Sequence, residues 1–550
     1  MAIIKKACPY CNKVTDLISE AVYGDLILRT FKCGHSTTET KAKELDRESI
    51  ESFKALDGKK LFPYQVDGVK LIFSSNGRAL IADEMGLGKT AQALVPLALQ
   101  PDEFLPAILV CKSVAKANHF RETVNFGHTI AQVIEETNSP WVDLFKVHII
   151  SYDLLNRIMN DKNRKGKRIR HLDFEAIRLR ARTIIIDETH LIKNPDTQRS
   201  KSVKLLCGGE DIVIDETSIL TFPAVPHIIG LSGTPIKNNA SEFFTILNIL
   251  YPEKFWRFNR FCQSHVQTVW DGYGWKYGGL RDPERFNDMT KEYFIRRTMD
   301  EVMPQLPKLW RHPSFADLEG EVAEIYNKEQ EEFADYFEDG RGDSDYQANI
   351  LAKMARLRHI TSLAKIDLCI DKACEFLGST DRKLAIFTHH LDTRDILAER
   401  LNKVLEELKL GQVVILAAKD KSQIEVEIAK FKDGPDRVLM LSTLAHGESL
   451  NLQFLSDSIL HERQWNPANE DQAISGRFRR LGQEAKAINC HILIAVGTID
   501  EYFAELVEKK REYVDASLNG GEAQPWDTSS LMMELASIIA EKGKRKWKIA

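Results

Sequence analysis

Three features are scarce in this sequence, and each absence excludes a class of protein. No apolar run is long enough to span a bilayer, and the N-terminus lacks the apolar segment of a secretory signal peptide, so we expect neither a membrane protein nor a secreted one. The nine cysteines are an odd number and mostly scattered, which indicates a reducing intracellular compartment and not a disulfide scaffold. The formal net charge is only −5, so any nucleic-acid binding must come from local basic patches.

The composition is that of a multidomain globular protein. Hydrophobic residues make up 43% of the chain and charged residues 28%. The length of 550 residues is sufficient for several domains, each with a sizeable core.

Three cysteines and a histidine gather near the start of the chain. Cys8 and Cys11 precede a strand-like stretch at residues 21–31, and Cys33 and His35 follow it. Two ligand pairs joined by a short hairpin predict a zinc ribbon, a closed tetrahedral site with a structural role. A unit of about forty residues has too little core to fold without such a metal. The alternatives are a redox Cys-x-x-Cys motif or free thiols.

A glycine-bearing loop at residues 83–90 has the pattern of a phosphate-binding loop. The apolar run at residues 79–82 predicts a strand before the loop, and residues 91–95 predict the start of a helix after it. Gly86 and Gly88 would let the backbone approach phosphate oxygens beside the positive end of that helix.

The residues around these glycines are expected to hold a nucleotide. Lys89 would lie on the β- and γ-phosphates, and the Thr90 hydroxyl would bind Mg²⁺. The common pattern begins with glycine where this chain has Asp83, so an ordinary loop is the alternative. Upstream, the Gln65 amide has the donor and the acceptor that are needed to recognise an adenine edge. Taken alone, Gln65 is more simply interpreted as a residue on the surface of a helix.

An acidic pair follows a second apolar strand. Residues 183–186 read Thr-Ile-Ile-Ile and lead into Asp187 and Glu188. Downstream of a phosphate-binding loop, this pattern predicts that Asp187 binds Mg²⁺ through water and that Glu188 orients the attacking water. We expect His190 to couple this site to neighbouring motifs.

The most basic stretch of the chain lies at residues 157–182. It contains ten lysines and arginines, against only Asp161, Asp173 and Glu175. A contact with a phosphate backbone and a solvated loop explain this stretch equally well.

The order of these motifs resembles the superfamily 2 DNA translocases of the Swi/Snf type. The family's own version of the phosphate-binding loop is Asp-Glu-Met-Gly-Leu-Gly-Lys-Thr, which accounts for Asp83. Residues 270–279, rich in Trp, Tyr and Gly, are similar to the branch that includes annealing helicases. His446 and Ser449 stand where the family usually has glycines. The other segments that carry the resemblance are Gln65 and residues 187–194, 231–235, 243–261, 294–308 and 472–483.

This resemblance implies an α/β fold with two RecA-like parallel-sheet lobes, helical protrusions and a small N-terminal zinc ribbon. The expected domains are the zinc ribbon and linker at 1–48, the ATP-binding lobe at 49–315, a helical linker or protrusion at 316–366, the second lobe at 367–515 and a tail at 516–550. The first lobe is expected to contain an insertion at 208–226 and a protrusion at 240–315.

The resemblance also assigns ligand contacts. The ATP-binding residues would be Gln65, Asp83, Glu84, Met85, Gly86, Leu87, Gly88, Lys89 and Thr90, and Mg²⁺ would lie on Thr90 and Asp187. The catalytic residues would be Lys89, Asp187, Glu188, Arg477 and Arg480, the two arginines stabilising charge on the γ-phosphate. The DNA-backbone contacts would be Lys112, Ser113, Ser151, Thr388, Ser442 and Thr443, with Trp465 either against DNA or in the core.

The predicted function is ATP-dependent movement along duplex or forked DNA in remodelling, repair, replication or recombination. The competing hypotheses are a strand-separating helicase, a catalytically weak zinc-bearing DNA-binding or scaffold protein, and a phosphate-loop enzyme without a nucleic-acid partner. The expected ligands are ATP, Mg²⁺ and Zn²⁺. The expected partners are DNA and a protein bound through the zinc ribbon, without a membrane. A zinc ribbon fused directly to the motor favours a bacterial cytoplasm, its own or phage-infected, over a nucleus.

Overall fold

The computed structural model describes most of the chain in two compact units. These are residues 1–302 with 516–525, and residues 303–515 with 526–550. The described residues are 5–7, 14–23, 26–31, 36–40, 45–162, 169–208, 211–213, 219–236, 239–270, 272, 274–340, 345–416, 421–443, 450, 452–479, 482–519 and 528–547.

A small antiparallel sheet begins unit 1. Its strands, in spatial order, are β1 (Lys5–Ala7), β2 (Val14–Tyr23), β3 (Leu26–Phe31) and β4 (Ser36–Thr40). Leu17 pairs with Phe31, so the beginning of β2 lies beside the end of β3. The four predicted zinc ligands, Cys8, Cys11, Cys33 and His35, lie outside the described residues.

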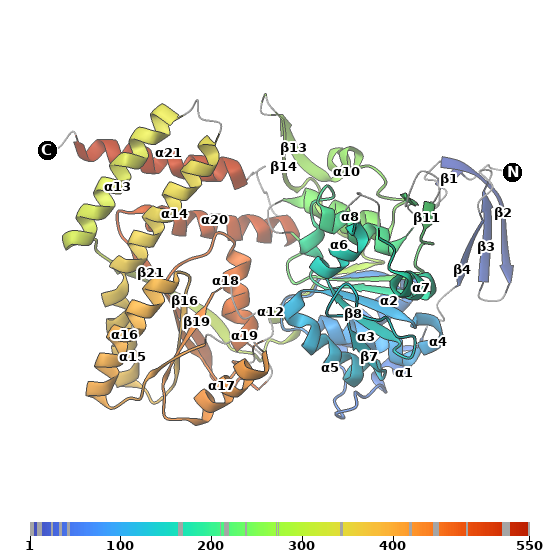
Figure 1. Ribbon diagram of the computed structural model, residues 1–550, viewed down its shortest axis with the longest axis horizontal. Helices are drawn as coiled ribbons and strands as arrows, with labels where there is room; N and C mark the ends of the chain where they lie inside the picture. The colour runs from blue at the N-terminus through green and yellow to red at the C-terminus, as the bar shows by residue number, and fades with distance from the viewer. Residues whose placement is uncertain are drawn as a thin grey trace. The chain divides into compact units, whose positions relative to one another are not determined.

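The main sheet of unit 1 has seven strands that all run parallel (Figure 1). In spatial order they are β15 (Phe294–Ile295), β5 (Arg78–Ile81), β12 (His227–Leu231), β9 (Thr183–Ile186), β6 (Ala107–Cys111), β8 (Val147–Ser151) and β7 (Ala131–Val133). The central strands are continuous apolar runs because helices cover both of their faces. Ile184, Ile185 and Ile186, for example, are all fully buried.

Helices surround this sheet, and two strand pairs are added to it. The longer helices are α2 (Pro63–Ser74), α3 (Lys89–Leu99), α5 (Lys116–Gly127), α6 (Tyr152–Asn160), α7 (Leu172–Arg180), α8 (Gln198–Cys207), α9 (Phe243–Leu250), α10 (Phe258–His265) and α11 (Pro283–Thr290). The shorter ones are α1 (Arg47–Glu51), α4 (Pro101–Phe104) and α12 (Met299–Val302). The antiparallel pairs are β10 (Asp211–Val213) with β11 (Ile219–Thr221), and β13 (Val266–Trp270) with β14 (Trp275–Leu280).

The parallel arrangement fixes the position of the predicted site. Parallel strands end at the same edge of their sheet, and ligands of such folds bind beyond that edge. Asp187 follows β9, and Ser232 follows β12, the neighbour of β9. The loop at residues 83–88 follows β5, which is the next strand along.

Unit 2 is built on a second parallel sheet, of six strands. In spatial order they are β16 (Lys308–Ala316), β21 (Ala487–Ala495), β20 (Asp457–Leu460), β17 (Leu384–Thr388), β19 (Val438–Ser442) and β18 (Val413–Ile415). The predicted fold class of two parallel-sheet lobes is therefore confirmed. The boundary expected at residue 315 differs from the structure, because β16 pairs with β21 along its whole length and so belongs to the second sheet.

The helices of unit 2 cover this sheet and form an extra helical layer. They are α13 (Gly320–Asp339), α14 (Tyr346–Ala364), α15 (Ile366–Ser379), α16 (Leu391–Leu408), α17 (Lys421–Asp433), α18 (Pro467–Ala473), α19 (Ser475–Phe478), α20 (Ile499–Asn519) and α21 (Thr528–Trp547). The expected tail at 516–550 contains α21, whose Leu535 and Ile539 are buried with Tyr326 and Phe333 of α13. Of the helices that the structure describes, none combines the length and apolarity needed to cross a membrane.

A buried ion pair connects three elements of unit 2. The ammonium of Lys365, at the junction of α14 and α15, lies 2.7 Å from a carboxylate oxygen of Asp500 in α20. The same ammonium donates to the carbonyl of Leu493 in β21. Neither charge is accessible to solvent, since the two side chains are 0% and 4% exposed. Each charge is therefore tolerated only because the other is present.

Removal of the Lys365 charge is expected to destabilise unit 2. Lys365→Met should lower the free energy of unfolding by about 3–5 kcal/mol, because Asp500 would remain buried without its cation. The matched control is Lys403→Met, which removes an exposed ion pair with Glu399 and should change the free energy of unfolding far less. Denaturant unfolding followed by circular dichroism measures both values. Equal losses would contradict this assignment.

Candidate nucleotide site

Two glycines shape the loop between β5 and α3. Gly86 and Gly88 have φ values of 91° and 70°, in the left-handed region that side chains other than glycine rarely adopt. A Cβ atom on Gly88 would also lie only 2.4 Å from the Gln65 amide nitrogen. Gly88 directly precedes α3, so the unbonded N–H groups of the first helical turn face the loop. This arrangement suits an anion such as phosphate.

The predicted phosphate ligand, Lys89, folds back over this loop. Its ammonium donates to the carbonyl oxygens of Asp83, at 2.9 Å, and Glu84, at 3.2 Å. Thr90 follows Lys89 in the first turn of α3. The ammonium thus lies over the loop, where the charged oxygens of a phosphate would be stronger partners than neutral carbonyls.

The segment after β12 packs against the same loop. A Cβ atom on Gly233 would lie 2.4 Å from the Met85 side chain and 3.4 Å from the Lys89 ammonium. The Ser232 hydroxyl accepts a hydrogen bond from the Thr234 backbone N–H at 3.2 Å. The close approach of these segments requires glycine at position 233.

Asp83, the residue that stands where glycine is common, is buried in an ion pair with Arg297. The Arg297 Nε donates to one carboxylate oxygen at 2.8 Å, and a second guanidinium nitrogen donates to the other at 2.5 Å. The Gln92 amide donates to Asp83 at 3.0 Å. Arg297 also donates to the backbone carbonyl of Tyr64 and lies over the Tyr64 ring. A charged cluster thus joins the phosphate-binding loop, α2, α3 and the segment after β15.

Gln65, the predicted adenine contact, is held by two backbone groups. Its amide oxygen accepts from the Phe62 N–H at 2.9 Å, and its amide nitrogen donates to the Leu87 carbonyl at 3.2 Å. The side chain is buried against the phosphate-binding loop. The structure therefore brings Gln65 and the loop together.

The acidic pair lies at the end of β9, as its sequence pattern predicts. An Asp187 oxygen lies 2.9 Å from the His119 ring nitrogen. Burial alone would raise the pKa of Asp187, but His119, Lys89 and Lys112 outweigh burial and lower the pKa overall. Asp187 is therefore an anion, which is the form that binds Mg²⁺.

The second acid, Glu188, occupies an unusual backbone conformation. Its φ of 54° is left-handed, which costs energy for a side chain other than glycine. Glu188 is buried, and one carboxylate oxygen lies 3.1 Å from the His190 ring. The carboxylate is thus fixed beside Asp187 by the backbone as well as by its neighbour.

In unit 2, Arg477 lies on α19 and is buried, with its guanidinium over the Phe387 ring. The neighbouring Arg479 donates to the Pro307 carbonyl at 2.8 Å. Arg480, the second predicted arginine, lies outside the described residues.

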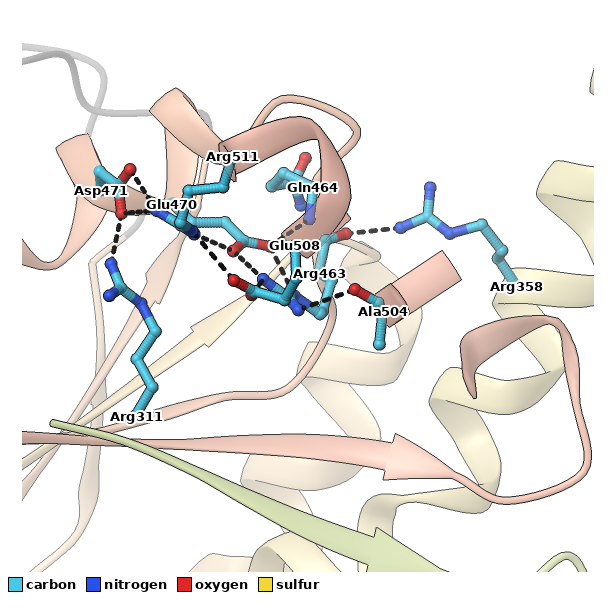
Figure 2. A network of polar contacts seen from close by, with 9 residues as sticks. All are labelled: Arg311, Arg358, Arg463, Gln464, Glu470, Asp471, Ala504, Glu508 and Arg511. Carbon is cyan, nitrogen blue, oxygen red and sulfur yellow. Dashed lines mark hydrogen bonds and ion pairs between the residues drawn. The ribbon is translucent and has the colours of Figure 1, made fainter. Parts of the chain in front are cut away.

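An ion network holds the segment that precedes Arg477 (Figure 2). Arg463 lies 2.7 Å from Glu470 of α18 and 2.6 Å from Glu508 of α20. Arg511 bridges Glu470 and Asp471, and Asp471 also pairs with Arg311 of β16 (Figure 2). Burial on its own would lower the pKa of Arg511, but these carboxylates raise it well above its usual range. The network ties α18 to α20 and to the edge strand of the sheet.

The predicted DNA contacts lie at strand ends but differ in their surroundings. Ser113 is exposed and Lys112 is half-buried, both directly after β6. The Ser151 hydroxyl is buried as the N-cap of α6 and accepts from the Leu154 N–H.

The remaining predicted contacts lie in unit 2. Thr388 and Ser442 end neighbouring strands in register, and the Thr443 hydroxyl donates to the Thr388 carbonyl at 3.4 Å. Trp465 packs edge-on against Phe503, with ring centroids 4.5 Å apart, so its ring contributes to the helical core.

Two residues of the site, His119 and Arg297, have no role that the sequence predicts. Arg297 lies in a segment that resembles the family, but its partner is 214 residues away in the sequence. Nothing in the sequence around His119 signals its contact with Asp187. Among the residues that the structure describes, no cluster of three or more potential metal ligands is found.

Residues 64–365 match the family model described as the SNF2-related domain, and residues 365–482 match the helicase conserved C-terminal domain. The bovine DNA annealing helicase and endonuclease ZRANB3 is 25% identical over 90% of this chain and 45% of its own length. The putative ATP-dependent helicase/translocase YwqA of Bacillus subtilis is 25% identical over 91% of this chain and 52% of its own. The chain thus spans about half the length of these relatives.

Among solved structures, the Sulfolobus solfataricus SWI2/SNF2 ATPase core in complex with dsDNA is 22% identical, with a TM-score of 0.38. That match covers 91% of this chain and 98% of the other.

The ion pair between Asp83 and Arg297 is expected to be essential for the shape of the loop. Arg297→Met should lower the free energy of unfolding by about 3–5 kcal/mol, because Asp83 would be left as an uncompensated buried charge. Binding of a fluorescent ATP analogue should be lost together with the loop conformation. Chemical denaturation and fluorescence titration measure the two effects.

Two control variants make this test specific. The double variant D83N/R297M removes both charges and should be more stable than Arg297→Met alone. Arg285→Met, on the exposed side of α11, should change neither stability nor nucleotide binding. If the double variant is less stable than the single one, the ion pair is not the reason for the effect.

Proposed function

Since this chain belongs to the SNF2-related family, we propose that it hydrolyses ATP to move along DNA. The observation that carries the proposal is the placement of a glycine-shaped loop and an acidic pair at the same edge of one parallel sheet. The loop has an ammonium, from Lys89, and the acidic pair has a carboxylate, Asp187, that stays ionised. These are the groups required for binding a nucleoside triphosphate with Mg²⁺.

Each residue of unit 1 has a defined task in this proposal. Lys89 binds the terminal phosphates, and the N–H groups of the loop and of the first turn of α3 surround them. Thr90 and Asp187 would hold Mg²⁺, which when bound neutralises charge on the phosphate oxygens. Glu188 orients and polarises the attacking water, and its left-handed backbone conformation fixes the direction of its carboxylate. Gln65 recognises the base.

Arg477 and Arg480 are the proposed source of positive charge in the transition state. Buried arginine is well suited to this task because its charge is permanent and its hydration is weak. The ion network around Glu470 supports the proposal, because it fixes α18, the helix that directly precedes α19 and Arg477.

DNA is the proposed substrate of the motor, through phosphate contacts that position the chain without reading sequence. The proposed contacts are Lys112, Ser113, Ser151, Thr388, Ser442 and Thr443. The names of the two relatives support this proposal, since one is called a DNA annealing helicase and the other a helicase/translocase. The alternative is a catalytically weak zinc-bearing DNA-binding or scaffold protein.

A structural zinc site in the N-terminal sheet is also proposed. The end of β1, the beginning of β2, the end of β3 and the beginning of β4 all lie at one end of this sheet. Cys8 and Cys11 follow β1, while Cys33 and His35 lie between β3 and β4. The strand register therefore supports a shared site, and we propose that this ribbon also binds a protein partner.

A reducing compartment is proposed for the protein, as in a bacterial cytoplasm. In the described part of the chain, the free cysteines are Cys111, Cys207, Cys262, Cys369, Cys374 and Cys490, and all but Cys374 are buried.

Steady-state ATP hydrolysis tests the proposed motor. We expect duplex or forked DNA to stimulate hydrolysis strongly, and Lys89→Ala to abolish it because the terminal phosphates lose their cation. Glu188→Gln should retain nucleotide binding and lose at least about a hundredfold in rate, since the water is no longer polarised. Stimulation by single strands alone would favour a strand-separating helicase. No hydrolysis under any condition would contradict the motor and favour the scaffold alternative.

Metal analysis of the purified protein tests the zinc site. We expect about one zinc ion per chain, and Cys11→Ser should release it because thiolate ligands dominate such sites. Cys374→Ser, which removes the less buried of the two thiols in α15, is the matched control and should leave the zinc content unchanged. A wild-type protein purified without bound zinc would contradict the proposal.

A further inference from the structure

An antiparallel strand pair in unit 1 carries two exposed tryptophans. Trp270 of β13 pairs directly with Trp275 of β14, and the side chains are 55% and 56% exposed. Their ring centroids are 5.5 Å apart at an interplanar angle of 68°, so the rings do not cover each other face to face. Figure 1 shows this strand pair beside α10, apart from the seven-stranded sheet of unit 1. We call Trp270 and Trp275 the tryptophan pair.

A basic groove adjoins the strand pair. Its volume is about 680 Å³, and it is lined by Trp256, Arg257, Phe258, Asn259, Arg260 and Gln263. The guanidinium groups of Arg257 and Arg260 lie 4.6 Å and 5.7 Å from the ring centroid of Trp256, which is 38% exposed. Phe258 of the groove contacts Tyr277 of β14, with ring centroids 5.4 Å apart. The groove and the strand pair thus share one surface.

The charge of this region differs from that of the whole protein. Residues 256–277, which span the groove and most of the strand pair, contain three lysines and arginines, Arg257, Arg260 and Lys276, against one acidic residue, Asp271. The chain as a whole has a net charge of −5. A local excess of cations on an acidic protein attracts a polyanion to that surface.

The exposure of the tryptophans identifies which polyanion fits. Core packing does not explain side chains that are more than half exposed, and clustered exposed aromatic groups usually mark a binding surface. Bases in a duplex are stacked on one another, whereas unpaired bases have free faces that stack on aromatic side chains. Arginines beside an indole supply contacts to the phosphates between such bases.

We propose that the tryptophan pair and the groove around Trp256 bind unpaired nucleotides of a DNA fork. The bases stack on the indoles, and Arg257 and Arg260 contact the backbone. This inference rests on the proposed function, because it assumes that the motor acts on DNA. It adds a second surface, outside the nucleotide site, that distinguishes a fork or gap from plain duplex.

Fluorescence anisotropy with two labelled DNAs tests this proposal in the full-length protein. One DNA is a blunt duplex, and the other is the same duplex with two unpaired thymidine arms. We expect the wild-type protein to prefer the forked DNA. The double variant W270A/W275A should lose roughly tenfold to a hundredfold in affinity for the fork, and its affinity for the blunt duplex should stay within about twofold.

Three further variants provide controls. W270F/W275F keeps an aromatic face at both positions and should retain most of the preference for the fork. R257A/R260A should weaken fork binding and reduce its dependence on salt, because two phosphate contacts are lost. Trp310→Ala removes an equally exposed tryptophan, at 56%, from β16 of unit 2 and should have no effect on the preference.

The outcomes separate this inference from the proposed function. Loss of fork preference in W270A/W275A, with duplex-stimulated ATP hydrolysis retained, supports the inference. Equal affinities of wild type and W270A/W275A for the fork would overturn it, and so would a parallel loss of affinity for both DNAs. A wild-type protein whose ATP hydrolysis does not respond to DNA would contradict the motor, whatever the binding result.

Discussion

The ion pair between Asp83 and Arg297 is the interaction on which the architecture of unit 1 depends most. Asp83 begins the phosphate-binding loop, and Arg297 follows the last strand of the unit, so the pair closes the sheet across 214 residues. Arg297 donates hydrogen bonds to both carboxylate oxygens of Asp83. Its third guanidinium nitrogen donates to the Tyr64 carbonyl. A buried charge that is compensated in this way tolerates only one arrangement of its partner. The shape of the loop therefore depends on the pairing of β15 with β5, because this pairing places Arg297 beside Asp83.

This closure explains how the phosphate-binding loop and the proposed DNA-binding surface can belong to one unit. The residues between β12 and β15 leave the sheet, form α9, α10, the β13–β14 pair and α11, and return to its edge. Phe243, Phe261 and Phe286 pack together at the base of this excursion. The exposed part of this segment can therefore present tryptophans and arginines to solvent without altering the phosphate-binding loop. Unit 2 uses ion pairs in a similar way, since Lys365 with Asp500 and Arg463 with Glu470 fix helices around its sheet.

Much of this structure was predictable from the sequence, for physical reasons. Strands buried on both faces are continuous apolar runs, so β5, β6, β8, β9, β12, β17 and β19 were all recognisable. Gly86 and Gly88 indicated the phosphate-binding loop because only glycine tolerates their backbone angles. Asp187 and Glu188 were recognisable because they directly follow an apolar strand, and the family resemblance assigned the rest of the site.

Other features could not be predicted from the sequence, because they depend on contacts between residues that are far apart in the chain. The contacts of Arg297 with Asp83 and of His119 with Asp187 join residues 214 and 68 positions apart. The sequence places most of β16 in the first lobe, because this strand is largely exposed, contains Pro313 and reads as an irregular edge segment. The burial of α21 against α13 likewise follows from packing, because an amphipathic helix does not reveal which surface will cover it.

Displacement of a third DNA strand from a duplex tests directly whether this protein moves along DNA. A motor that moves along duplex DNA removes a bound third strand without separating the duplex, and only while it hydrolyses ATP. We expect ATP-dependent displacement by the wild-type protein, none by Lys89→Ala, and none with a non-hydrolysable analogue. ATP hydrolysis that is stimulated by duplex DNA but leaves the third strand in place would contradict the proposed movement along DNA.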